Sequence, residues 1–331
     1  MAGLIHPVTI AGGGLAGLSL GIALLRRGAE VTLHEAGNYP RHRVCGEFLS
    51  GVRDSTLEKL GIARVLDGAV ALATSRWFDA GGPVGRFPVA GRGISRWVLD
   101  DRLQSEFVKS GGNLKTGSRV DPGTDVVWAA GRIRTDGRWI GVKCHVHDLA
   151  LEADLEMHIG SNGYAGLAKI EGGKVNLCGL FRRQKGIGGK DALFQCLQAG
   201  GLTALAGRVS RAAPDPDSFC AVAGFEPGRQ AGPPFSVGDA AWMIPPFTGN
   251  GMSMAFEAAE AALDPILEFA AGRISWAEAG EAAASAQRRR FARRMRVSSW
   301  LHGVIINHPS LAGAAARCNA IPFGILLRLL R

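Results

Sequence analysis

Three glycines near the N-terminus have the spacing of a turn that binds the pyrophosphate of a dinucleotide. Gly12, Gly14 and Gly17 follow a short β-branched run and precede an apolar pattern of helical period. In such a turn the first glycine allows the bend, the second admits the pyrophosphate, and the third lets helix and strand pack closely. Glu35 stands 18 residues beyond Gly17, where a carboxylate can bind a ribose diol. The pattern fits NAD and FAD equally, and its expected cofactor contacts are Gly12, Gly14, Leu15, Ala16, Gly17 and Glu35.

A second candidate cofactor site surrounds Asp239. This residue ends a predicted strand, so its carboxylate could accept hydrogen bonds from cofactor hydroxyls, or it could simply cap a helix. Gly249, Asn250 and Gly251 open the next predicted helix. Their lack of bulk would let backbone N–H groups reach a flat cofactor ring, and the helix N-terminus would stabilise negative charge on that ring.

The elements that must position these residues begin with a βαβ unit. Residues 8–11 and 31–35 are predicted strands, and the residues between them form the glycine turn and a helix. Two later runs, 125–131 and 235–239, are typical of strands that end at a turn of a parallel sheet. Apolar and polar residues alternate across 140–181, as in an antiparallel sheet.

We therefore expect an α/β fold with two sheets. A doubly wound parallel nucleotide-binding sheet is interrupted by an inserted antiparallel β-sheet domain for the substrate, and helices follow at the C-terminus. The expected ranges are 1–70, 93–138 and 223–275 for nucleotide binding, 71–92 and 139–222 for the substrate sheet, and 276–331 for the C-terminal helices.

Five segments of the chain resemble the FAD-dependent monooxygenase and oxidoreductase superfamily typified by para-hydroxybenzoate hydroxylase, and look most similar to its geranylgeranyl reductase branch. They are the glycine turn with Glu35, PRHRVCGE at 40–47, RxxLDxxL at 96–103, WAAG at 128–131, and VGDAA at 237–241 with PFTGNGM at 246–252. The resemblance implies bound FAD, with NAD(P)H as the expected electron donor. It also implies cofactor contacts at Arg41, Cys45, Gly46, Arg96, Gly131, Gly238, Asp239, Pro246, Gly249, Asn250, Gly251 and Met252.

Departures from the family pattern narrow what the resemblance implies. Ala130-Gly131 stands where relatives have Asp-Gly, which argues against NADPH docking of the para-hydroxybenzoate hydroxylase type. The YxWxFP signature of geranylgeranyl reductases is absent, and residues 163–167 stand in its place. The paired tryptophans and the active-site lysine of flavin halogenases are also missing, so prenyl reduction and halogenation are both less favoured.

Tyr164, His145 and His147 are the expected catalytic residues, because they lie on predicted strands of the inserted sheet, which the resemblance places beside the flavin. They could equally be core residues. No carboxylate or cysteine completes a metal set with His145, His147 and His158, so no metal is expected. The six scattered cysteines contain no CxxC pair and are typical of free thiols in a reducing cytoplasm.

Positive charge is concentrated at the C-terminus. The chain has 331 residues, 47% of them apolar, and a net charge of +9, to which residues 273–331 contribute ten arginines and two glutamates. Such a stretch is typical of a solvated helix face, or of a surface attracted to anionic lipid or to an acidic carrier. The amphipathic segment 321–330 is expected to pack in the core, to cover a hydrophobic substrate, or to anchor the protein at a membrane interface.

Several partners are excluded by what the sequence lacks. No nucleic-acid reading motif accompanies the basic residues, and no run reaches the roughly 18 to 20 apolar residues of a membrane span. We therefore expect a cytoplasmic protein with no nucleic-acid partner, and peripheral membrane contact through the basic C-terminal region stays an open alternative.

The expected function is that of a FAD-dependent oxidoreductase. The main hypothesis is a monooxygenase that hydroxylates or epoxidises an aromatic, polyketide or other hydrophobic natural-product substrate, free or carrier-bound. The alternatives are a carbon–carbon double-bond reductase or dehydrogenase of the geranylgeranyl reductase type, an NAD dehydrogenase, and a flavin- or lipid-binding module without turnover. In each FAD-dependent enzyme the cofactor would carry the redox step, while the protein positions the substrate and excludes water.

Overall fold

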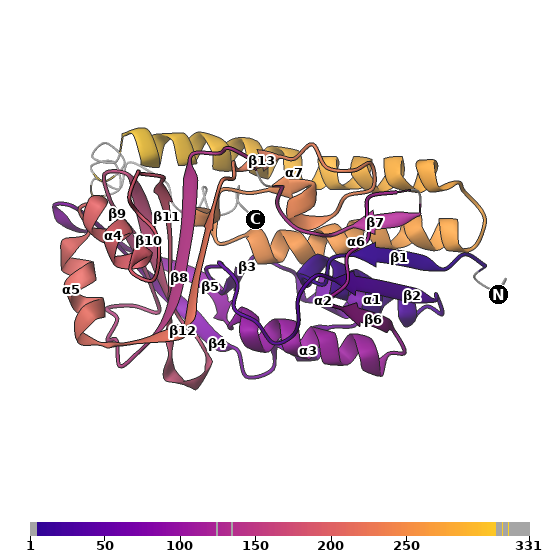
Figure 1. Ribbon diagram of the computed structural model, residues 1–331, viewed down its shortest axis with the longest axis horizontal. Helices are drawn as coiled ribbons and strands as arrows, with labels where there is room; N and C mark the ends of the chain where they lie inside the picture. Colours follow the sequence, from indigo (N-terminus) through magenta and orange to yellow (C-terminus); the bar gives the residue numbers. More distant parts are fainter. Residues whose placement is uncertain (1–4, 124, 134, 309–312, 314–316, 318–331) are drawn as a thin grey trace.

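A four-stranded parallel sheet carries the N-terminal glycine turn. The computed structural model describes residues 5–123, 125–133, 135–308, 313 and 317. The strand order is β6-β2-β1-β7, and all neighbouring strands are parallel. The bounds are β1 Val8–Ala11, β2 Val31–Glu35, β6 Asn113–Thr116 and β7 Val126–Trp128. The predicted βαβ unit is thus present at one end of the elongated molecule (Figure 1).

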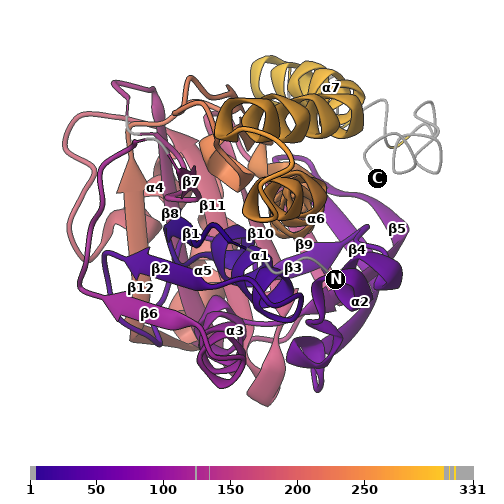
Figure 2. The ribbon, with the colours of Figure 1, turned by 90° about the vertical axis from the view of Figure 1, so that its right-hand side faces the viewer.

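Helix α1 (Leu15–Leu25) joins β1 to β2 and is buried on almost every side. It is covered by α6 (Gly251–Ala270) and by α3 (Arg96–Lys109), between which it lies in Figure 2. Gly21 allows the close contact with α3, because a Cβ atom there would collide with the Phe107 ring. The helix is therefore apolar all round, as expected for one enclosed by other helices and a sheet.

A second sheet of eight strands forms the other half of the molecule, in the order β12-β8-β11-β10-β9-β4-β5-β3. The bounds are β3 Phe48–Ser50, β4 Val70–Asp79, β5 Gly82–Gly93, β8 Trp139–His147, β9 Leu155–Ile159, β10 Gly163–Lys169, β11 Val175–Arg182 and β12 Ala213–Ala223. Its neighbours are antiparallel except β4 and β9, which are parallel. The sheet is therefore mixed, with one parallel pair, and not purely antiparallel as expected.

The two faces of this large sheet are covered differently. One face packs on α4 (Ala192–Ala199) and α5 (Thr203–Arg211) through an apolar cluster. Because side chains alternate along a strand, Lys143, His145 and Tyr164 point to the opposite face. We call this opposite face the inner face, since it is the one that meets the segment at 42–47.

The longest helix, α7 (Trp276–Asn307), runs along the molecule beside α6 (Figure 1). It begins with a capping box, in which the Ser275 hydroxyl accepts the Glu278 N–H and the Glu278 carboxylate accepts the Ser275 N–H. None of the described helices combines the length and apolar content that a bilayer crossing requires.

The arginine-rich stretch of α7 is not a uniformly solvated face. Arg288 and Arg289 are exposed, as expected. Arg290 and Arg294 instead turn toward Glu257 on α6, with Arg294 Nη1 3.0 Å and Arg290 Nε 3.5 Å from its Oε2. The expectation of a solvated face is wrong for these two residues, because a buried carboxylate requires a cationic partner.

The remaining expectations have different outcomes. The helix predicted to open at Gly249, Asn250 and Gly251 is present as α6. The run 235–239 forms only a bridge between Ser236 and Trp128, because it enters a 3-10 turn at Gly238. Segment 321–330 lies outside the described residues. Strand β3, which falls within the expected nucleotide-binding range 1–70, pairs with β5 in the large sheet, and the domain ranges themselves stay a prediction.

Candidate cofactor and substrate site

The N-terminal glycine turn has the shape that a pyrophosphate requires. A Cβ atom at Gly12 would collide with the Ala129 carbonyl, and one at Gly17 would collide with the Gly12 carbonyl. Gly14, the N-cap of α1, has no atom within 4 Å of the position of its absent Cβ. The start of α1 therefore presents backbone N–H groups to open space, an arrangement that suits an anionic ligand.

Glu35 is buried directly behind this turn. Its Oε2 accepts the Gly13 N–H at 2.8 Å, and its Oε1 accepts the Gly37 N–H at 2.9 Å and the Arg41 guanidinium at 2.6 Å. Burial by itself raises the pKa of Glu35, but Arg43, the Gly37 N–H and Arg41 lower it below the usual value. The carboxylate is therefore ionised and holds the turn in shape, while Arg41 lies against it.

Arg96 and Arg43 share one buried carboxylate. Arg96 Nε and Nη2 lie 2.6 and 2.8 Å from the two oxygens of Asp100, and Arg43 Nε lies 2.9 Å from the second oxygen. Asp100 is fully buried, and it raises the pKa of Arg96 even though burial opposes this. The expected cofactor contact Arg96 is thus fixed by a bidentate ion pair, which holds the guanidinium in one orientation.

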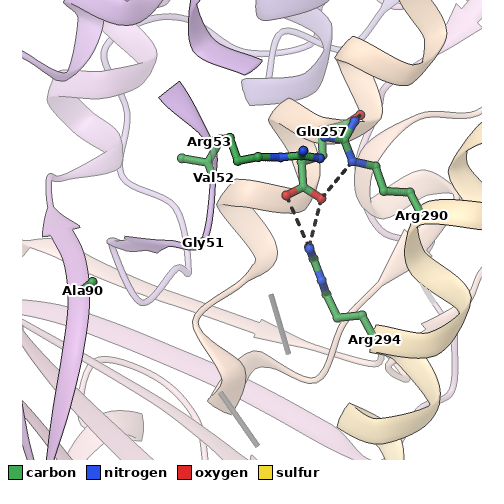
Figure 3. A pocket seen from close by; sticks show the side chains of 7 residues that line it. All are labelled: Gly51, Val52, Arg53, Ala90, Glu257, Arg290 and Arg294. Carbon is green, nitrogen blue, oxygen red and sulfur yellow. Dashed lines mark hydrogen bonds and ion pairs between the residues drawn. The ribbon is translucent and has the colours of Figure 1, made fainter. Parts of the chain in front are cut away.

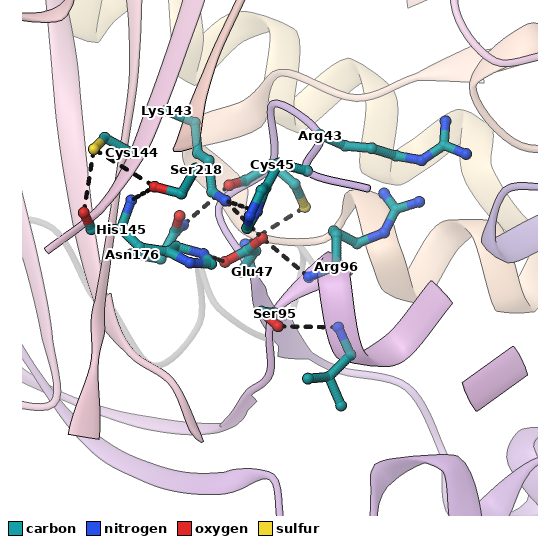
Figure 4. Close-up of polar contacts among 12 residues, drawn as sticks. Arg43, Cys45, Glu47, Ser95, Arg96, Lys143, Cys144, His145, Asn176 and Ser218 are labelled. Atoms are coloured by element: carbon teal, nitrogen blue, oxygen red, sulfur yellow. Dashed lines mark hydrogen bonds and ion pairs between the residues drawn. The ribbon is translucent and has the colours of Figure 1, made fainter. Parts of the chain in front are cut away.

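Glu47 is the centre of a buried polar network on the inner face of the large sheet (Figure 4). Its Oε1 accepts the Arg96 N–H at 3.0 Å and lies 3.3 Å from Lys143 Nζ, while its Oε2 lies 2.6 Å from His145 Nε2. Lys143 Nζ also lies 3.0 Å from His42 Nδ1. Burial, Lys143 and His145 lower the pKa of His42 to about 4, so its neutral ring accepts a hydrogen bond from the Lys143 ammonium.

Cys45 lies beside this network, and its thiol is neutral. Burial raises its pKa, and the neighbouring Arg96 only partly offsets that effect. Its sulfur accepts the Glu47 N–H, and its carbonyl accepts a hydrogen bond from Asn176. A redox-active thiolate is therefore not favoured here, because thiolate chemistry requires a lowered pKa.

The glycine turn at 246–252, which we call the late glycine turn, meets the segment that follows Glu47, although the two lie about 200 residues apart in the chain. Ser50 Oγ donates to Asn250 Oδ1 at 3.1 Å, and the Ser253 hydroxyl donates to the Ser50 carbonyl. A Cβ atom at Gly249 would collide with the Phe48 ring. The structure thus brings the turn that the sequence assigned to the flavin ring against the strand that directly follows the expected cofactor contacts Cys45 and Gly46.

Asp239 follows Gly238, which takes a positive φ of 64° and packs against Ala16 at the start of α1. Burial raises the pKa of Asp239, and Arg132 and Arg96 oppose this shift. The turn that carries this carboxylate therefore lies against the N-terminal glycine turn, so that one elongated cofactor could contact both.

The three expected catalytic residues occupy different places. His145 belongs to the Glu47 network, and Tyr164 lies near Phe247 of the late turn and His302 of α7, with ring centroids 6.2 and 6.4 Å away. His147 lies at the partly exposed end of β8. The structure therefore does not bring the three together. Among the residues that it describes, no group of three histidine, cysteine, aspartate or glutamate side chains could hold a metal ion.

Comparison with known proteins gives a partial sequence match and full-length structural matches. No protein-family model matches the chain. It is 29% identical over 119 residues to a menaquinone reductase of Mycolicibacterium smegmatis and 26% identical to one of Mycobacterium tuberculosis strain H37Rv. Each match covers 34% of this chain and 29% of the relative, so it spans less than a third of the relatives' length.

Many solved structures match almost the whole chain. The flavin-dependent brominase Bmp2 matches with a TM-score of 0.73 at 18% identity, over 98% of this chain and 93% of its own. PqsL of P. aeruginosa, solved with 2-aminobenzoylacetate, matches with 0.69 at 17% identity, over 94% and 96%. A variant of HpxO of Klebsiella pneumoniae, solved with FAD, matches with 0.69 at 15% identity, over 93% of each chain. This chain has the fold of the flavin-dependent monooxygenases.

Several residues of the site were not among those predicted from the sequence. Glu47, Arg43 and Asp100 stand inside the quoted motifs, so the motifs could have placed these residues at the site, although not the partners of Glu47 on the large sheet. Lys143 has a visible signal, a charged residue at an inward position of a strand that is otherwise buried. His302 has none, because its helix pattern does not distinguish it from a solvent-facing residue.

A cavity of about 640 Å³ lies between the β3–α2 connection (α2 is Asp54–Leu60), β5, α6 and α7 (Figure 3). Its lining residues are Gly51, Val52, Arg53, Ala90, Glu257, Arg290 and Arg294. The Glu257 carboxylate pairs with both Arg290 and Arg294. The lining charge is therefore partly neutralised within the protein.

Proposed function

We propose that this protein is a FAD-dependent oxidoreductase, and more narrowly a monooxygenase that acts on an aromatic or other hydrophobic small molecule. One observation carries the proposal: the turn at 249–252 meets the strand that follows 45–47, and the turn that carries Asp239 packs against the start of α1 at the glycine turn 12–17. That fold matches the FAD-containing HpxO over 93% of both chains. The open space at Gly14 and the collisions at Gly12 and Gly17 fit a pyrophosphate.

Each proposed contact has a separate task. The N–H groups at the start of α1 bind the pyrophosphate, Glu35 binds the adenosine ribose, and Asp239 binds the ribityl hydroxyls. Gly249 and Gly251 let the backbone approach the edge of the ring, where the N-terminus of α6 stabilises negative charge. When bound, FAD supplies the electron transfer and the oxygen chemistry, and NAD(P)H is the proposed reductant.

The chain's own residues would position the substrate and exclude water. The inner face of the large sheet offers apolar and aromatic side chains close to the late glycine turn, among them Tyr164 beside Phe247. Such a wall fits a planar hydrophobic molecule better than a charged one. Enclosure by the sheet and by α7 would keep solvent away from the reacting atoms.

Flavin binding is tested with a variant that the fold itself tolerates. Gly14 has an extended backbone and open space at its Cβ position, so Gly14→Val should fold but obstruct the pyrophosphate. We expect FAD affinity to fall at least about tenfold, a change of 1.4 kcal/mol in binding free energy. Gly188→Val, also at an open position, is the matched control and should retain FAD. Purified wild-type protein that neither carries nor takes up flavin would contradict the proposal.

A second candidate function is the reduction of a quinone-like lipid. It is favoured by the partial match to the menaquinone reductases, which covers 29% of their length. Flavin reoxidation separates the two candidates: a monooxygenase consumes O2 in step with product formation, whereas a reductase passes electrons to a menaquinone analogue without O2. Anaerobic turnover with such an analogue would support the reductase.

We also propose that the exposed arginines of α7, among them Arg288, Arg289 and Arg293, attract an anionic surface, either lipid or an acidic carrier. The proposed compartment is the cytoplasm. Flotation with vesicles that contain anionic lipid should be lost in the triple variant in which these arginines become glutamine. Equal flotation of both proteins would exclude the lipid surface, and capture by an acidic carrier protein would then be tested.

A further inference from the structure

The cavity between the β3–α2 connection, β5, α6 and α7 is lined by more cations than its one carboxylate requires (Figure 3). Arg53, Arg290 and Arg294 supply three guanidinium groups, and Glu257 supplies the carboxylate. Arg294 already pairs with both carboxylate oxygens, because its Nη1 lies 3.0 Å from Oε2 and its Nη2 lies 3.4 Å from Oε1. A buried carboxylate needs a cationic partner, but three cations around one carboxylate exceed that need.

Two of the three guanidinium groups have N–H donors that no described residue accepts. Arg53 is exposed, and its side chain has no hydrogen bond or ion pair with the described part of the chain. Arg290 donates from Nη1 to Glu260 at 2.7 Å, and its Nε lies 3.5 Å from Glu257, which leaves Nη2 without a partner among the described residues. Even when Glu260 is counted, three arginines face two carboxylates, so at least one positive charge is left for a ligand.

The cavity also has more room than a small ion would occupy. Its volume of about 640 Å³ lies within the usual range of ligand pockets, about 300–1,000 Å³. Arg53 and Ala90 are exposed, whereas the Arg294 side chain is only 6% exposed, so the lining extends from the surface to buried charge. Gly51, Val52 and Ala90 add a wall without charged groups. The cavity therefore suits a ligand with an anionic end and an apolar end.

The arrangement of the free donors favours a phosphate group over a carboxylate. Arg53 belongs to the β3–α2 connection and Arg290 to α7, so their guanidinium groups reach the cavity from different elements (Figure 3). A phosphate monoester offers three acceptor oxygens and can be shared by two arginines. A carboxylate has only two oxygens, and one guanidinium can engage both.

We infer that this cavity binds the phosphate group of an amphiphilic phosphate monoester. Arg53 and Arg290 donate to the phosphate oxygens, and the organic part of the ligand lies along the wall at Val52 and Ala90. Glu257 acts in positioning, because it lies between Arg290 and the buried Arg294. The inference goes beyond the proposed function, since none of the residues that line the cavity is among the proposed flavin contacts.

The phosphate site nevertheless adjoins the late glycine turn. Gly51, in the lining, directly follows Ser50, whose hydroxyl donates to the side chain of Asn250 at the start of α6. Glu257 lies seven residues further along α6 (250 to 257), which at 1.5 Å per residue is about 10 Å. A ligand held in the cavity therefore contacts the same strand end and the same helix as the turn proposed to meet the flavin.

The test is a calorimetric titration of the full-length protein with n-hexyl phosphate, inorganic phosphate and 1-hexanol at matched ionic strength. We expect n-hexyl phosphate to bind at least about tenfold more tightly than the other two, each of which carries one end of the ligand. Arg53→Gln should weaken its binding about tenfold, because hydrogen bonds to a charged group are lost. Ala90→Phe, which fills the cavity without changing its charge, should weaken it as well. Arg64→Gln removes an exposed arginine outside the lining and should have no effect.

Binding of n-hexyl phosphate that is undetectable, or no tighter than that of 1-hexanol, would overturn the inference. An equal loss in Arg64→Gln, or binding that both Arg53→Gln and Ala90→Phe leave unchanged, would overturn it too. Vesicles that contain phosphatidic acid, itself a phosphate monoester, identify the source of the phosphate. Flotation that Arg53→Gln abolishes assigns a lipid head group, and n-hexyl phosphate binding without flotation assigns a soluble ligand. Flavin absorbance of the same samples reports on the cofactor proposal separately.

Discussion

Replacing Lys143 with methionine should reveal how much the Glu47 network contributes to the free energy of unfolding. Both side chains are fully buried, with Lys143 Nζ 3.3 Å from Glu47 Oε1. Lys143→Met keeps most of the aliphatic volume but leaves the carboxylate with only the His145 ring and the Arg96 N–H. Removing one partner of a buried pair costs about 3–5 kcal/mol. We expect about 3 kcal/mol, because two donors remain.

Urea denaturation followed by tryptophan fluorescence measures this loss. A double-mutant cycle with Glu47→Gln should give a coupling energy of about 1–3 kcal/mol, because the glutamine no longer needs a cationic partner. Lys169→Met is the control, since Lys169 is 43% exposed and its pair with Asp154 should contribute less than about 1 kcal/mol. If Lys143→Met costs no more than this control, or if the cycle is additive, the reasoning about the network is wrong.

Three further variants test other features by the same denaturation assay. The pKa of His302 falls from 6.5 to about 4 on folding, so its contribution to wild-type stability should be complete well above pH 6.5 and should decrease by about 3 kcal/mol toward pH 4. His302→Phe should lose this dependence. Burial raises the pKa of Glu156, but His158 and Arg208 lower it to about 2. Glu156→Gln should therefore lower the free energy of unfolding by about 2 kcal/mol at pH 7, and by progressively less as the pH falls below 4.5. A loss that does not change between pH 7 and a pH below 4.5 would contradict this. Ser275→Ala removes the capping box of α7 and should cost about 1 kcal/mol, and no change would mean that the box does not stabilise the helix.

Local patterns predicted the parts of the site that a short stretch of chain determines. The spacing of Gly12, Gly14 and Gly17 between two strand patterns predicted the βαβ unit, because the turn leaves no room for a side chain at Gly12 or Gly17 and Gly14 keeps the ligand side open. The helix that opens at Gly251 was predicted for the same reason. These features depend on neighbours within about 30 residues, so their physics is visible in the sequence.

Contacts between distant segments could not be predicted in the same way. Nothing near Glu47 in the sequence indicates that Lys143 and His145 will meet its carboxylate, because the pairing depends on how the large sheet docks. The position of β3 in the large sheet is likewise set by its pairing with β5 and not by its own three residues. The inward turn of Arg294 requires the buried Glu257, which lies on another helix.

Strand β3 joins the two halves of the molecule mechanically. One edge of it is hydrogen-bonded into the large sheet, while Ser50 at its end holds the first turn of α6, against which α1 of the parallel-sheet half packs. A force or a ligand that displaces the start of α6 must therefore also displace the outermost strand of the opposite sheet. Because β3 is bonded to both halves, we expect both to melt in one step and a fragment that lacks either half not to fold alone.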